Sequence, residues 1–356
     1  SPCSPPPDGD TARRWEALFP PPEWLRGALR RRLADDRDEL LAWTLFDAAA
    51  VVIPSAAALF ALFPASHALG AAFLVATRVL FLQRIMLALH YSAHRPLFRR
   101  ETLTGQLLGR APDLVLSPLF GVPPGLYHLH HVNMHHSESN GSAWDVSSTE
   151  PFQRDNPAHF LVYWLRFVVL LWFELPAYAW RRGRHAQALR ATAGEIAYLA
   201  SVFLLWKHVA PVATLYVFIL PFFITSLALC FGNWSQHILI DKKSAKTPAG
   251  LAYNAINCDD NARSFNDGYH LLHHLNARWH WSELPSKFRE EQVLRTLAKS
   301  DAITFQGVGF FDIGVMVFAR QLRTLVRKHL VVLPGQPQRS EDEWVAVLKD
   351  RLKPVR

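Results

Sequence analysis

Hydrophobic residues gather in five long runs along the chain, with polar segments between them. The runs cover residues 40–63, 65–89, 159–180, 193–209 and 212–231. A helix needs about 20 mostly apolar residues to cross a hydrocarbon core of about 30 Å. The runs therefore predict long apolar helices in a membrane, and the break at Pro211 predicts that the last two runs form a hairpin.

The segments outside these runs predict a tail, a loop and a cap. Residues 1–38 are rich in Pro, Arg and Asp, so we expect a tail with one short surface helix near residues 24–33. Residues 112–125 are apolar but broken by Pro and Gly, which predicts a buried loop. We divide the chain into this tail (1–38), a catalytic membrane domain (39–300) and a C-terminal cytoplasmic helical cap and tail (301–356).

Composition narrows the class of protein. Half of the residues are apolar and 19% are charged, which excludes a disordered chain. A net charge of +8 would suit nucleic acid, but the basic runs flank apolar segments, as in membrane proteins with a positive cytoplasmic side. We therefore expect a multi-pass integral membrane protein without a nucleic-acid partner, and endoplasmic reticulum and plastid membranes fit equally. Three scattered cysteines predict neither a disulfide framework nor a cysteine metal site.

Histidines are concentrated in four short segments. These segments hold eleven of the 17 histidines: His90 and His94; His128, His130, His131, His135 and His136; His237, four residues after Asn233; and His270, His273 and His274. We treat the remaining six as ordinary residues: His67, His159, His185, His208, His280 and His329.

The spacing within these segments suits metal binding. Each residue of a helix turns about 100°, so His90 and His94 lie on one face, one turn apart. Adjacent histidines such as His273 and His274 diverge enough to serve two different metals. Neutral imidazole suits iron, zinc and copper. A single pair could be merely interfacial, but four such segments in one membrane protein predict a metal site.

The motifs HxxxH, HxxxHH and HxxHH, in this order, resemble the three histidine boxes of the membrane fatty acid desaturase superfamily. The Asn233-x-x-x-His237 motif is similar to a further ligand helix of that family, in which the Asn holds an iron-bound water. The resemblance implies four membrane helices, a cytoplasmic cap and a di-iron centre, with Asn233 as a catalytic residue. It implies nine metal ligands: His90, His94, His131, His135, His136, His237, His270, His273 and His274.

Two points of the pattern leave choices open. On an ideal helix His128 shares a face with His131 and His135, so His128 could replace His131 as a ligand. The acids and amide near the boxes are candidates to hold the imidazoles, and the polar run 145–155 is expected to order the site. These candidates are Glu138, Asp145, Asp259, Asp260, Asn266 and Asp267. The sequence has no His-Pro-Gly-Gly motif of a fused cytochrome b5 domain, so electrons are expected from a separate cytochrome b5 or ferredoxin.

The histidine segments also constrain the topology. If they share one site, they lie on one side of the membrane, and an even number of crossings separates them. The run 159–180 contains Arg166, Glu174 and Pro176 and precedes a basic stretch at Arg181. We therefore predict that this run lies in the interface or re-enters it. Four spanning helices in two hairpins remain, in an all-α fold with both termini and the boxes on the cytoplasmic side.

These observations favour an acyl-chain desaturase that uses O2, two iron ions and two electrons to place a double bond in a lipid. A hydroxylase or monooxygenase would share the ligands, and a non-catalytic scaffold with a structural metal is an alternative of a different class. A zinc hydrolase is disfavoured, because such a site needs only about three protein ligands and a water. Aromatic residues at the helix ends are expected to line the path of the acyl chain: Phe120, Tyr127 and Trp234.

Overall fold

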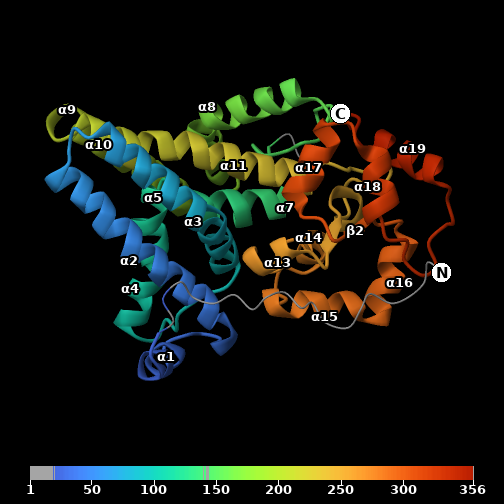
Figure 1. The fold of residues 1–356 in the computed structure, drawn as a ribbon, viewed down its shortest axis with the longest axis horizontal. Helices are drawn as coiled ribbons and strands as arrows, with labels where there is room; N and C mark the ends of the chain where they lie inside the picture. The colour runs from blue at the N-terminus through green and yellow to red at the C-terminus, as the bar shows by residue number, and fades with distance from the viewer. Residues whose placement is uncertain (1–18, 20, 139, 142–143, 356) are drawn as a thin grey trace. The chain divides into compact units, whose positions relative to one another are not determined.

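The computed structural model describes residues 19, 21–138, 140–141 and 144–355. These residues are mostly helical (Figure 1) and divide into two compact units. Unit 1 contains residues 135–167 and 230–355, and unit 2 contains the described residues up to 134 together with 168–229.

Among the described residues, five helical segments are long and apolar enough to cross a membrane. They are α2 (Glu39–Leu62, preceded by the short turn η1, Asp36–Asp38), α3 (His67–His94), α8 (Pro157–Arg181), α9 (His185–His208) and the segment Pro211–Gln236. The last comprises α10 (Pro211–Thr214), η4 (Leu215–Ile219) and α11 (Leu220–Gln236). Large apolar side chains on these helices are exposed, such as Val79 at 79% and Phe173 at 71%, as a lipid-facing surface requires. The predicted class, a helical multi-pass membrane protein, is confirmed.

The helix boundaries differ from the apolar runs in an instructive way. Helix α3 continues past the run to His94, so both histidines of the first box lie on it. Helix α9 begins at His185, eight residues before the run 193–209. Residues 185–192 are helical but include polar side chains, so the search for apolar runs did not include them. Helix α8 is continuous over 25 residues in spite of Pro176. The length and composition of α8 also fit a helix that crosses the membrane. Its placement in the interface is therefore still a prediction, which the helix itself does not test.

Segments outside the long helices match the predictions in part. The short helix near residues 24–33 is confirmed as α1 (Glu23–Arg30). The loop predicted at 112–125 is wrong for residues 112–119, where α4 (Leu103–Ala111) continues into η2 (Pro112–Leu116) and α5 (Ser117–Leu119). Pro112 begins the π-helical turn and Pro118 lies just after it, so both prolines fall where the hydrogen-bond pattern of the helix changes. Short helical segments then carry the second box: α6 (Leu126–His128), η3 (Leu129–His135) and α7 (His136–Glu138).

The C-terminal part of unit 1 surrounds a small parallel sheet that the sequence did not predict. Strand β1 (Asn254–Ile256) pairs with β2 (Thr304–Gln306), with Ala255 opposite Phe305. Ala255 faces a core that contains Trp234 and Leu348, and Ile256 faces a second core. The surrounding helices are α12 (Pro248–Leu251), α13 (Asp259–Arg263), α14 (His270–Leu275), η5 (Trp281–Glu283), α15 (Leu284–Arg289), α16 (Glu291–Lys299), α17 (Phe310–Phe318), α18 (Leu322–His329) and α19 (Glu341–Arg351).

Candidate metal centre

Four histidines of unit 1 converge on one point. One nitrogen from each of His135, His237, His270 and His274 lies within 4.8 Å of the other three. His135 ends η3, His237 directly follows α11, and the other two are one turn apart on α14. We call this group the quartet. Its members are buried or nearly so, and they come from three segments that are distant in sequence.

The spacing of the ring nitrogens fits a metal ion. The Nε2 atom of His270 lies 3.2 Å from that of His237 and 3.1 Å from that of His274. Two nitrogens bound at right angles to one metal, each about 2.1 Å from it, lie about 3 Å apart. The quartet therefore has both the donor atoms and the spacing that an imidazole-ligated ion needs.

Contacts to the outer nitrogens orient two of these rings. The Nδ1 atom of His135 lies 3.0 Å from Oδ2 of Asp145, and the Nδ1 atom of His237 lies 2.9 Å from the carbonyl oxygen of Leu251. Ser147 donates its backbone N–H and its hydroxyl to the other oxygen of Asp145, at 2.8 and 2.6 Å. Each Nδ1–H thus has an acceptor, which leaves the Nε2 lone pair for a metal.

Burial keeps two members of the quartet, His237 and His274, uncharged. Burial, and next the neighbouring His135, lower the pKa of His237 to about 3. Burial likewise lowers the pKa of His274 well below its usual value, and the surrounding histidines add to the effect. Both imidazoles are therefore neutral at pH 7, which is the form that binds a cation.

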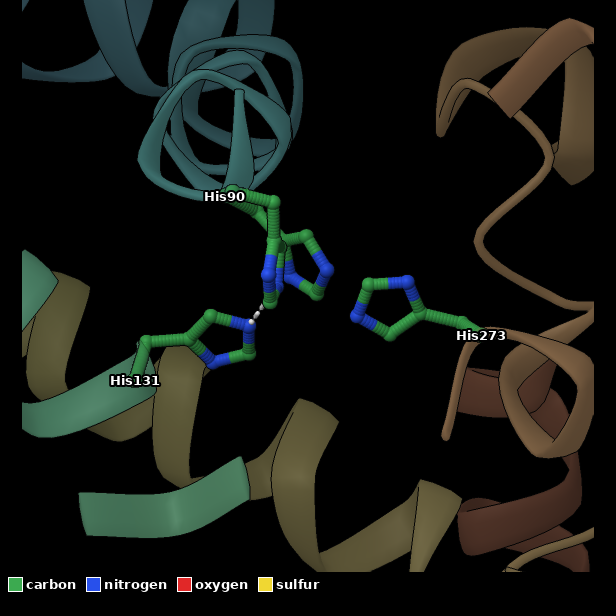
Figure 2. Close-up of side chains that lie close together, drawn as sticks. His90, His131 and His273 are labelled. Atoms are coloured by element: carbon green, nitrogen blue, oxygen red, sulfur yellow. Dashed lines mark hydrogen bonds between the residues drawn. The ribbon is translucent and has the colours of Figure 1, made fainter. Parts of the chain in front are cut away.

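Unit 2 gathers the first box with one histidine of the second. The Nε2 atoms of His94 and His131 are 2.9 Å apart, and the rings of His90 and His131 lie 4.2 Å apart. Figure 2 shows His131 directed toward the end of the helix that carries His90. Tyr127 stacks on His131 and donates its hydroxyl to the carbonyl oxygen of Met86 at 3.3 Å. These three histidines form a second cluster, which we call the triad.

The structure places His131 rather than His128 in the triad. His128 is exposed, and its Nδ1 lies 3.1 Å from the carbonyl oxygen of Ala93. The reason lies in the backbone: residues 129–135 form a π-helix, whose i to i+5 hydrogen bonds make each residue turn less than 100°. The face shared by His128 and His131 on an ideal α-helix is therefore not maintained.

Two further histidines of the predicted set pair within unit 1. The Nε2 atoms of His136 and His273 are 3.1 Å apart, and the ring of His136 stacks on that of His274. His136 and His135 diverge as adjacent residues, with ring planes at 87°. The six histidines treated as ordinary belong neither to the quartet nor to the triad.

Asn233 has a structural connection that the sequence did not reveal. Its Nδ2 donates to the carbonyl oxygen of Ser147 and to the hydroxyl of Tyr163, both at 2.9 Å. Asn233 therefore joins α11 to the segment with Asp145 and Ser147, which orients the ring of His135. The Oδ1 atom of Asn233 is the atom available for a further partner. Asp145 was among the predicted orienting acids, whereas Ser147 and the Leu251 carbonyl carry no motif that marks them in the sequence.

The aromatic residues expected along the acyl path pack tightly. Phe120 is fully buried, with the guanidinium of Arg78 4.2 Å from its ring centre. Trp234 is also fully buried and donates its indole N–H to the carbonyl oxygen of Arg154 at 3.1 Å. Both positions have a clear packing role, and contact with an acyl chain stays a prediction.

Comparison with known proteins identifies the family. The fatty acid desaturase family model matches residues 64–306, which is more than half of the chain, and the chain therefore belongs to this family. The family consists of oxidoreductases that act on acyl chains. The two histidine clusters are consistent with a di-metal centre in such an enzyme. No curated protein and no solved structure matches the chain.

Proposed function

We propose that the protein is an O2-dependent acyl-lipid desaturase that holds two iron ions. The observation that carries the proposal is the quartet, whose ring nitrogens have the spacing of metal ligands, with His237 and His274 held in the neutral form that binds a metal. We assign nine histidines as ligands, with the quartet on one ion: His90, His94, His131, His135, His136, His237, His270, His273 and His274. When bound, the iron pair supplies the oxidising power to remove hydrogen from unactivated methylene groups.

The residues around the quartet supply orientation and exclude water. Asp145 fixes the ring of His135 and, through Ser147, the adjoining backbone. The Leu251 carbonyl fixes the ring of His237, which is fully buried. A rigid, dry ligand set lowers reorganisation and prevents loss of oxidising equivalents to water. Asn233, one turn before His237, is our candidate for holding a water at the metal through Oδ1.

We propose a separate protein as the electron donor. Exposed lysines follow His237 within a few residues, at Lys242, Lys243 and Lys246. Acidic redox carriers such as cytochrome b5 and ferredoxin are complementary to such a loop, and complementary charge speeds their encounter. The protein should therefore turn over only when such a carrier is added.

One experiment tests metal and reaction together. The protein is expressed in a desaturase-deficient host, its metal content is measured, and fatty acids and sphingoid bases are profiled by mass spectrometry. We expect about two iron atoms per chain by ligand count and a new double bond in an acyl chain. A hydroxylated product would mean that the protein is a hydroxylase that uses the same ligands. Stoichiometric zinc without iron would reject the di-iron centre.

A further inference from the structure

A buried arginine of unit 1 lies at the centre of a network that reaches His237. Arg154 is fully buried, and its guanidinium donates hydrogen bonds to backbone carbonyl oxygens. Nε donates to Ile238 at 3.0 Å, and Nη2 donates to Arg351 at 2.8 Å and Lys353 at 2.6 Å. Nη1 donates to the carbonyls of residues 149, 150 and 152 at 3.1–3.3 Å. All five N–H groups of the guanidinium are thereby used.

The last described residues of the chain belong to this network through their backbone. We call residues 351–355 the C-terminal latch. Arg154 N–H donates to the Leu352 carbonyl, Ile240 N–H donates to the Arg351 carbonyl, and Val355 N–H donates to the Glu150 carbonyl, each at 2.9 Å. The latch therefore connects the segment around Arg154 with the segment that follows His237.

The Arg351 side chain fixes the latch from its other side. It is 5% exposed and donates Nη2 to the Asp301 carbonyl at 3.0 Å. The same nitrogen lies 3.6 Å from the carboxylate of Asp241 and 3.7 Å from that of Asp301. Removing one partner from such a buried charge is strongly destabilising, so this end of the latch is held firmly.

These contacts act on a metal ligand at the very end of a helix. Helix α11 ends at Gln236, and the N–H of His237 still donates to the Asn233 carbonyl at 3.0 Å, but the chain leaves the helix directly after it. Its carbonyl accepts a hydrogen bond from the Thr149 hydroxyl at 3.0 Å, the next carbonyl accepts from Arg154, and Ile240 is bonded to the latch. Three contacts, at residues 237, 238 and 240, thus set the backbone that aims the imidazole of His237.

We propose that the C-terminal latch, acting through Arg154, positions the metal ligand His237. The latch lies beyond residue 306, where the family match ends, so it is a feature that the family model does not cover. The proposal rests on the metal-binding quartet of the proposed function, and it assigns Arg154 and residues 351–355 as positioning residues. The integrity of residues 351–355 then decides how tightly the quartet holds its ion.

Iron retention and amide hydrogen exchange test the proposal on the full-length protein. Arg154→Gln removes most of the carbonyl contacts, and deletion of residues 353–356 removes the Lys353 carbonyl and the Val355 N–H. Iron per chain is measured after timed dialysis against a chelator, and exchange of the Ile240 amide is measured by mass spectrometry. We expect about 10–100-fold weaker iron retention in Arg154→Gln, as for other residues that orient a ligand. We expect faster Ile240 exchange in both variants.

Controls separate positioning from a general loss of stability. Lys349→Ala changes an exposed side chain of α19 just before the latch and outside its network, so it should behave as wild type. Arg154→Lys keeps the charge and should lie between wild type and Arg154→Gln. If Arg154→Gln does not fold, the deletion and Arg154→Lys carry the test. Unchanged iron retention and unchanged Ile240 exchange in folded variants would overturn the proposal that the latch positions His237. Wild-type protein without iron would reject the proposed function instead. In that case the exchange of the Ile240 amide would still decide whether the latch holds this backbone.

Discussion

The two units hold their histidines in different ways. In unit 2, His90 and His94 lie on α3, where the hydrogen bonds of a 28-residue helix fix their spacing. In unit 1, His237 lies after the end of α11, and its carbonyl is bonded to Thr149, 88 positions away in sequence. Local helix geometry is sufficient for the first pair, whereas the second position depends on contacts between distant segments.

Two buried arginines show the same contrast. Arg154 of unit 1 reaches carbonyls of irregular segments with all its N–H groups. Arg78 of α3, in unit 2, donates to the Leu119 carbonyl at 3.1 Å, but its Nε and Nη1 have no hydrogen-bond partner among the described residues. Helices use their carbonyls internally, so a cation among long helices finds few acceptors. Irregular backbone is therefore what makes the network around His237 possible.

The largest effect that the comparison predicts is for His237→Ala. The change removes one imidazole from the quartet and leaves its partners His270 and His274 with an incomplete set. Iron bound by the quartet should be lost and desaturation should fall by at least about 100-fold, more than for an orienting residue. Iron analysis and product formation check this, with His329→Ala in unit 1 as the control. Full iron content and normal turnover would show that unit 1 does not need this ligand.

Asn233→Ala should give a smaller and differently divided effect. Asn233 contacts Ser147 and Tyr163 and is not part of the quartet, so the protein should keep its iron. If Asn233 also holds a water at the metal, turnover should fall by about 10–100-fold. Iron content and rate are measured on the same detergent-solubilised sample. Near-normal turnover would restrict Asn233 to its role in joining α11 to the Ser147 segment.

The contrast also concerns what the sequence could predict. The spacing of His90 and His94 and the apolar runs are local patterns, so the long helices and the first box could be predicted. The choice between His128 and His131 stayed open in the sequence, because the π-helix at 129–135 decides it and such a backbone shift has no simple sequence signal. The pairing of Arg154 with Lys353 spans 199 positions, and no periodicity marks carbonyl acceptors. The sequence therefore indicated that these histidines gather into clusters and missed much of what orients them.

The metal-free protein should lose stability in mild acid. The pKa of His237 is lowered to about 3 and that of His274 is also lowered, from about 6.5 in the unfolded chain. The unfolded state then binds more protons below pH about 6.5, so stability is complete above that pH and is lost as the pH falls from about 6.5 toward 3. Each buried histidine contributes at most about 1.4 kcal/mol per pH unit. Denaturant titrations at pH 7.5 and 5.5 measure the change, and equal stability at both would contradict the neutral, buried state of His237 and His274.

Unit 2 should be sensitive instead to close helix packing. A Cβ added at Gly194 of α9 would collide with the Pro124 carbonyl oxygen, which belongs to the backbone. Gly194→Ala should therefore destabilise the protein by about 1–3 kcal/mol, as overpacking does. Gly109→Ala in α4 is the matched control, since its Cβ would meet nothing within 4 Å. Thermal unfolding in detergent compares the two, and equal midpoints would mean that α9 adjusts without loss.

The smallest effect is expected for charges on the surface of unit 1. Lys242 and Lys243 are exposed and follow the ligand His237 by only five and six positions, whereas Arg110 is exposed on α4 of unit 2. If an acidic carrier docks at the lysine loop, changing both lysines to Gln should slow reduction several-fold, and Arg110→Gln should leave it unchanged.

Salt should reduce the wild-type rate, since charges are screened over about 8 Å at roughly 0.15 M ionic strength, and the double variant should respond less. Stopped-flow reduction by cytochrome b5 and by ferredoxin, with both variants at several salt concentrations, measures this directly. An equal salt response in wild type and the double variant would place the carrier elsewhere, and a larger effect from Arg110→Gln would move electron entry to unit 2.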